Sequence, residues 1–161
     1  MHVFRGLPSP LQRRPSAVAI GNFDGVHLGH QALLEYVKEA AQARGLVPSV
    51  VTFEPHPKDF FGRGGEVARI STLYDKVNAI LGTGIERIYI LPFNSRLACM
   101  PAETFVRDVL LKGLDACWMS VGKDFRFGGD RAGSVELLKS SPAHCPTSST
   151  SPRPSITRRP A

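Results

Sequence analysis

Apolar and polar residues follow one another along the chain in blocks that suit strands and helices in turn. Four short apolar runs are typical of buried strands, and they lie at residues 17–23, 48–57, 86–93 and 115–125. Three segments between them carry apolar residues at helical spacing, at residues 30–45, 71–84 and 101–113. Strands that alternate with helices favour a parallel sheet with right-handed crossovers. We therefore predict an α/β fold, a Rossmann-like parallel sheet with helices on both faces.

Local signals mark the expected helices. The first has an apolar face made of Leu33, Leu34, Val37, Ala40 and Ala41, and Gly45 is expected to end it. The second has Ser71 and Thr72 as candidate caps, and its apolar face consists of Leu73, Val77, Ile80 and Leu81. Pro101 is placed to open the third.

The end of the chain has a different composition. In residues 140–161, 14 of 22 residues are Ser, Thr or Pro, and Ile156 is the only aliphatic residue larger than alanine. Such a segment buries too little apolar surface to offset the entropy lost on ordering. We therefore predict one domain at residues 1–139 and a disordered tail at residues 140–161.

The net charge of +6 changes this picture only slightly. The tail holds three arginines and no acidic residue, so residues 1–139 carry 17 basic against 14 acidic residues, or +3. The sequence has no basic run interleaved with aromatic residues, no apolar run of the roughly 20 residues that span a bilayer and no secretory signal. Its three cysteines lack zinc-site spacing. We expect a cytoplasmic protein that binds small anions, with no nucleic-acid or membrane partner and no structural metal.

Clusters rich in glycine, proline and polar residues follow each predicted strand. They are GNFDGVHLGH (21–30), FEPHP (53–57), PFNSRL (92–97) and VGKDFRFGGDRAG (121–133). In open parallel sheets, ligands bind beyond the carboxyl ends of the strands. We therefore expect these clusters to meet at one edge of the sheet and to form one site.

The first cluster has the residues of an anion site. A helix N-terminus presents free N–H groups and the positive end of the helix dipole. Gly21, Gly25 and Gly29 allow the backbone to come close to a ligand, and His27 and His30 can donate hydrogen bonds to phosphate oxygens. The patterns of the P-loop and of the dinucleotide-binding Rossmann turn are both missing from the sequence, which disfavours those two kinds of site.

The H-x-G-H pattern, between a predicted strand and a predicted helix, resembles the signature of the nucleotidylyltransferases, an α/β superfamily. Together with TFEPHP (52–57), LPFNSRLACMPAETF (91–105) and VGKDFRFGGDRAG (121–133), it is similar to the FMN adenylyltransferase module of bacterial FAD synthetases. The resemblance covers residues 1–139. It implies ATP and FMN as substrates, FAD and pyrophosphate as products, and Mg²⁺ bound through the ATP phosphates.

The resemblance also implies roles for individual residues. His27 and His30 would hold and stabilise the triphosphate, while Asn22 and Asp24 would order the loop or touch phosphate. Other residues expected at the nucleotide and its phosphates are Gly21, Phe23, Gly25, Gly29, Asp124, Arg126 and Arg131. Those expected at the flavin are Pro55, His56, Pro57, Phe125 and Phe127. Simple turn roles for Asn22 and Asp24, core packing for one of the two phenylalanines, and solvated surface for the two arginines remain open.

One family segment has no good counterpart. Relatives continue with I-S-S-T-x-I-R, which leads into a helix and clamps the nucleotide phosphates. Residues 148–153, SSTSPR, match part of it by letter, but Pro152 and Pro154 disfavour a following helix. We expect a module that is incomplete at its C-terminal end, by truncation or by a frame shift after Lys139, and that lacks the riboflavin kinase domain of the family. Two alternatives remain: an impaired fragment that binds flavin or nucleotide, and another H-x-G-H enzyme such as a pantetheine-phosphate adenylyltransferase or a cytidylyltransferase.

Overall fold

The computed structural model describes residues 2–23, 28–54, 72–121 and 156–158, and the structural statements below concern these parts of the chain. The strands are β1 (His2–Arg5), β2 (Ser16–Ile20), β3 (Val47–Glu54), β4 (Arg87–Pro92), β5 (Ala116–Val121) and β6 (Ile156–Arg158). The helices are α1 (Leu28–Arg44), α3 (Leu73–Leu81), α4 (Ser95–Cys99) and α5 (Ala102–Thr104), with the 3-10 helix η1 (Pro10–Gln12) and the π-helix η2 (Phe105–Gly113).

The strands form one sheet in the order β1-β4-β3-β2-β5-β6, and every neighbouring pair is parallel. The predicted α/β architecture with a Rossmann-like parallel sheet is therefore confirmed. After β2 the chain adds β3 and β4 on one side, and it then returns to place β5 on the other side of β2. The carboxyl end of β2 thus lies at the point where the strand order reverses, which is where ligands bind in open α/β sheets.

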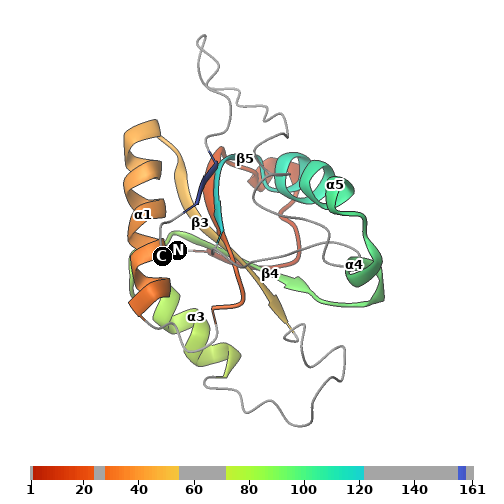
Figure 1. Ribbon diagram of the computed structural model, residues 1–161, viewed down its shortest axis with the longest axis horizontal. Coiled ribbons are helices and arrows are strands. Elements are labelled where there is room, and N and C mark those ends of the chain that lie inside the picture. The colour runs from red at the N-terminus through yellow and green to blue at the C-terminus, as the bar shows by residue number, and fades with distance from the viewer. Residues whose placement is uncertain (1, 24–27, 55–71, 122–155, 159–161) are drawn as a thin grey trace.

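Helices cover both faces of this sheet, with α1 and α3 on one side and α4, α5 and the helix that continues from α5 on the other (Figure 1). Successive strand residues point to opposite faces. Ala17 and Ala19 of β2 therefore pack in the core beneath α1 and α3, while Val18 and Ile20 pack in the core beneath η2. The two cores share the sheet as their common wall.

The predicted helix faces are confirmed where the structure describes them. All five apolar residues named for the first helix are buried, and Gly45 directly after it adopts a left-handed conformation with φ +66°, as a helix-ending glycine does. Thr72 caps α3 by accepting a hydrogen bond from the Asp75 N–H at 3.1 Å. Ile80 is fully buried, and the other three apolar residues of that face pack against the same core.

The sheet gains two edge strands and one helix that the pattern does not predict. The side chains of β1 are mostly exposed, so it shows no buried run, and its pairing with β4 holds it in place. At the other edge, Ile156–Arg158 pairs with β5 as β6, so the prediction of disorder fails for these three residues, because backbone pairing needs no apolar side chains. The rest of the predicted tail lies outside the described residues. The short helix α4 begins at Asn94, whose side chain accepts a hydrogen bond from the Leu97 N–H at 3.0 Å.

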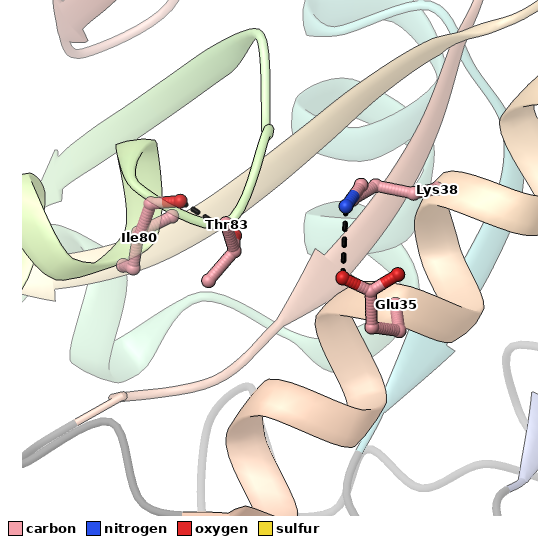
Figure 2. Close-up of polar contacts among 4 residues, drawn as sticks. All are labelled: Glu35, Lys38, Ile80 and Thr83. Atoms are coloured by element: carbon pink, nitrogen blue, oxygen red, sulfur yellow. Dashed lines mark hydrogen bonds and ion pairs between the residues drawn. The ribbon is translucent and has the colours of Figure 1, made fainter.

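The turn after α3 packs against α1. Figure 2 shows the two local contacts on either side of this junction: Lys38 Nζ lies 2.8 Å from Glu35 Oε1 within α1, and the Thr83 hydroxyl donates to the Ile80 carbonyl at 2.6 Å. Gly84 has φ +96°, and a Cβ atom there would lie 3.1 Å from Cε of Lys38. This junction is an ordinary surface contact. Within the described part of the chain, no helix combines the length and apolar character needed to cross a bilayer.

Candidate functional site

The carboxyl ends of the central strands meet at one edge of the sheet. Ile20, the last residue of β2, pairs with Val51 of β3 and with Val121, the last residue of β5. Glu54 at the end of β3 pairs with Pro92 at the end of β4. Each of the four predicted clusters therefore begins at, or directly beside, a strand end on this edge.

Five of the predicted site residues are described, and all five follow β2: Gly21, Asn22, Phe23, Gly29 and His30. The other predicted site residues lie outside the described residues. They are Asp24, Gly25 and His27 of the first cluster, Pro55, His56 and Pro57 after β3, and Asp124, Phe125, Arg126, Phe127 and Arg131 after β5. Their roles stay predictions.

His30 lies in the first turn of α1. Its imidazole is half-buried and lies against the Phe23 ring, with 5.2 Å between the ring centroids and 52° between the planes. Gly29 precedes it in the same turn and is exposed. The first turn of this 17-residue helix therefore presents a histidine, an open glycine and the positive end of a helix dipole at the edge where the strands end.

Phe23 has an unusual backbone. Its φ is +52°, a left-handed conformation that bulky L-residues rarely adopt. Its ring is only 1% exposed and packs in the core shared by α1 and the sheet. Burial of the ring leaves the backbone of Phe23 for any contact with a nucleotide. Such local strain persists where the surroundings fix the conformation, and it concentrates at functional sites.

Gly21 makes room for this phenylalanine. A Cβ atom at position 21 would lie 3.2 Å from Cε2 of Phe23, closer than ordinary contact. The Gly21 N–H meanwhile donates to the Val51 carbonyl at 3.1 Å, so the backbone here still follows the sheet. In the structure the missing side chain of Gly21 serves the packing of the Phe23 ring; the predicted close approach to a ligand stays untested.

Asn22 connects β2 to two other elements through its backbone carbonyl. This oxygen accepts hydrogen bonds from the Thr52 hydroxyl and from Lys76 Nζ, both at 3.1 Å. Thr52 on β3 is fully buried, and Lys76 on α3 is 6% exposed. The Oδ1 atom of the Asn22 side chain is also buried, and among the described residues it accepts no hydrogen bond. A buried amide oxygen in this state is suited to a donor that a bound ligand or its water brings.

Thr52 and Lys76 are site-edge residues that the sequence reasoning missed. Lys76 could have been found, because it lies three residues after Leu73 and four before Ile80 and so shares the apolar face of α3. A lysine on an apolar face is unusual, since charged side chains are almost never fully buried unless they are paired. Thr52 gives no such signal, because threonine is common in strands.

Comparison with known proteins decides the family. The family model of FAD synthetase matches residues 9–156. The chain belongs to the FAD synthetase family. The match continues past Lys139, where we predicted that the domain ends; that boundary stays a prediction.

Relatives of this FAD synthetase family member include bifunctional proteins. The chain is 41% identical over 140 residues to the bifunctional riboflavin kinase/FMN adenylyltransferase of Pseudomonas fluorescens, in an alignment that covers 86% of this chain and 45% of the relative. It is 37% identical over 142 residues to the protein of the same description from Escherichia coli strain K12, again with 86% and 45% covered. The chain therefore spans about half the length of these relatives, and the match concerns their FAD synthetase domain.

A solved structure confirms the architecture. The crystal structure of a macrolide-efflux protein from Streptococcus pneumoniae aligns with a TM-score of 0.76 at 24% identity, over 99% of this chain and 51% of that one. At this identity the likeness shows the fold alone.

Proposed function

We propose that this chain transfers the adenylyl group of ATP to FMN and so forms FAD and pyrophosphate. The observation that carries the proposal is the position of His30 in the first turn of α1, at the carboxyl end of β2 where the strand order reverses. Membership of the FAD synthetase family makes ATP and FMN the natural substrates for a phosphate site in that place.

The reaction needs little chemistry from the protein. A phosphate oxygen of FMN is already anionic and attacks the α-phosphorus of ATP; the bond from that phosphorus to the oxygen bridging to the β-phosphorus breaks, and pyrophosphate leaves with the electron pair. Catalysis of such a transfer depends on positioning and on charge stabilisation. His30 and the N–H groups of the first turn of α1 would donate hydrogen bonds to phosphate oxygens as the charge moves onto pyrophosphate. His27 would act beside it.

The described residues fit a Mg²⁺ ion that is held mainly by the substrate. Among them, no three His, Cys, Asp or Glu side chains gather into a metal-binding group. The buried Oδ1 atom of Asn22 offers one oxygen ligand or one acceptor for metal-bound water. Mg²⁺ commonly binds through one or two protein oxygens, water and substrate phosphates, and in this reaction it supplies neutralisation of the phosphate charge.

Small molecules are the proposed partners, and the cytoplasm is the proposed location. Cys99 and Cys117 are both free thiols, as expected in a reducing compartment.

An acceptor assay tests the proposed function. The purified chain is incubated with Mg²⁺ in three separate reactions. The first contains FMN and ATP, the second 4′-phosphopantetheine and ATP, and the third CTP with a phosphate ester that cytidylyltransferases use. Chromatography should show FAD from FMN and no product from the other two. Product only from another acceptor would assign a different member of the nucleotidylyltransferases, and binding of FMN or ATP without any product would assign a binding fragment.

A further inference from the structure

Lys76 is buried beside the carboxyl end of β2, in a position that core packing does not explain. It is 6% exposed on the apolar face of α3, next to Val77 and in line with Ile80. Burying a lysine costs free energy unless its ammonium group is well bonded. Its Nζ atom reaches across to the Asn22 carbonyl at 3.1 Å, a contact between residues far apart in the sequence.

The Asn22 carbonyl is held from two sides. Thr52 donates to it from β3 and Lys76 donates from α3. The same peptide group continues into Phe23, whose φ of +52° is unfavourable for a phenylalanine. Two buried donors on one carbonyl fix the orientation of that peptide, and this orientation sets the left-handed turn that follows.

The left-handed turn at Phe23 also sets the position of His30. The Phe23 ring lies in the core with this backbone conformation, and it packs against the imidazole with 5.2 Å between the centroids. If the peptide between Asn22 and Phe23 rotated, the ring would move and the imidazole would lose the surface against which it packs. A continuous chain of contacts therefore runs from Lys76 through Asn22 and Phe23 to His30.

We propose that Lys76 is a positioning residue for adenylyl transfer: it holds the Asn22–Phe23 peptide and thereby fixes His30 at the phosphates. The proposal rests on the proposed function for the meaning of "phosphates", but the positioning itself concerns this chain alone. Lys76 does not itself touch the reacting atoms. It acts through the Asn22–Phe23 peptide and His30.

The main variant is Lys76→Met, which keeps an unbranched stem and removes the ammonium group. Its matched control is Lys38→Met on α1, which removes a lysine whose ammonium pairs with Glu35 (Figure 2). Lys38 lies about two helical turns after His30. A second pair tests the other donor: Thr52→Val removes a hydroxyl bonded to the Asn22 carbonyl, and Thr83→Val removes a hydroxyl bonded to the Ile80 carbonyl. Lys76→Arg keeps both donor and charge.

Three readouts separate positioning from general stability. The first is kcat and KM for FAD formation, the second is the thermal unfolding midpoint, and the third is hydrogen exchange of the amides at residues 21–23 without ligand. Lys76→Met should lose about 10-fold to 100-fold in kcat/KM, chiefly in kcat, because a displaced catalytic group is costly. Amides 21–23 should exchange roughly tenfold faster, since local opening becomes easier. Lys38→Met should change neither kcat/KM nor the exchange of these amides, and the two methionine variants should have similar unfolding midpoints. Lys76→Arg should recover most of the kcat/KM that Lys76→Met loses.

Each outcome decides the matter. Wild-type kcat and unchanged exchange in Lys76→Met would overturn the proposal, as would a kcat loss that Lys38→Met shares. If the wild-type chain forms no FAD, the proposed function fails, and the exchange experiment alone then decides: faster exchange in Lys76→Met but not in Lys38→Met supports positioning, and equal exchange overturns it. If Lys76→Met does not fold, Thr52→Val against Thr83→Val gives the same two answers.

Discussion

The carboxyl edge at β2 and the face beneath η2 bury different kinds of groups. At the edge, the Asn22 carbonyl, the Thr52 hydroxyl and the Lys76 ammonium group meet in the interior beside the left-handed Phe23. Between η2 and the sheet, the core consists of apolar side chains, among them Leu110 and Phe105 of η2. The first arrangement breaks local rules of packing and backbone conformation, whereas the second follows them. The difference supports the proposal that the β2 edge binds the substrates, while the η2 face contributes stability.

The largest effect on stability is expected beneath η2. Leu110 is fully buried there, so Leu110→Ala should lower the free energy of unfolding by about 2–5 kcal/mol through lost burial and a cavity. Urea denaturation measures this change, and Leu111→Ala, at a half-buried neighbour, should cost clearly less. FAD formation per folded molecule should stay at the wild-type rate; a large loss of kcat at full folding would break the division between the two regions.

The largest effect on activity is expected at the edge. His30→Ala removes a phosphate-side donor, and kcat should fall by about 10² to 10³. The midpoint of unfolding should change little, because the imidazole is only half-buried. Gln42→Ala, at an exposed position of α1, serves as control. Equal rates for both variants would remove His30 from the catalytic machinery.

The glycine at the end of η2, Gly113, should give a smaller effect on stability. A Cβ atom at Gly113 would lie 2.9 Å from Cδ1 of Leu7 and 3.0 Å from the Asp108 carbonyl. Gly113→Ala should therefore lower stability by about 1–3 kcal/mol through overpacking, with activity per folded molecule preserved. Adding Leu7→Ala should restore part of the loss, since Leu7 is half-exposed; no recovery would mean that the Asp108 backbone contact dominates.

Gly21, at the carboxyl edge, should affect activity more than stability. Gly21→Ala pushes on the Phe23 ring from 3.2 Å and so on the position of His30. We expect about a tenfold loss of kcat with a loss of stability of about 1 kcal/mol. Gly82→Ala, at the end of α3 with φ −62°, is the matched control. If both variants lose stability and neither loses kcat, the Phe23 ring does not position the site.

The smallest effect is expected at an exposed ion pair on η2. The hydrogen bond from Arg107, 3.0 Å away, lowers the pKa of Asp108 below its ordinary value of 3.8. A carboxyl group whose pKa is lower in the folded than in the unfolded state stabilises the fold fully above its unfolded-state pKa. This contribution is lost as the pH falls through the folded-state pKa. Thermal unfolding of Asp108→Asn should therefore start slightly below wild type at neutral pH and converge with it in acid. Exposed ion pairs contribute little to stability. A large difference in the unfolding midpoint between Asp108→Asn and wild type would therefore contradict a weak, exposed pair at this position.

The sequence predicts the layered fold well and the internal geometry of the site poorly. Apolar periodicity identifies β2 to β5 and the faces of α1 and α3, because burial selects those residues directly. It misses β1 and β6, since both are edge strands that depend on backbone pairing, and β1 has no buried side chain. The left-handed Phe23 could not be predicted, because its conformation results from contacts with β3 and α3 that only the fold creates.

Labelled ATP tests the claim of adenylyl transfer most directly. The purified chain is incubated with FMN, Mg²⁺ and ATP that carries a radioactive phosphorus at either the α or the γ position. We predict label in FAD from α-labelled ATP alone and label in pyrophosphate from γ-labelled ATP. No label in FAD from the α position, under conditions in which the chain is folded and both substrates are present, would contradict the claim.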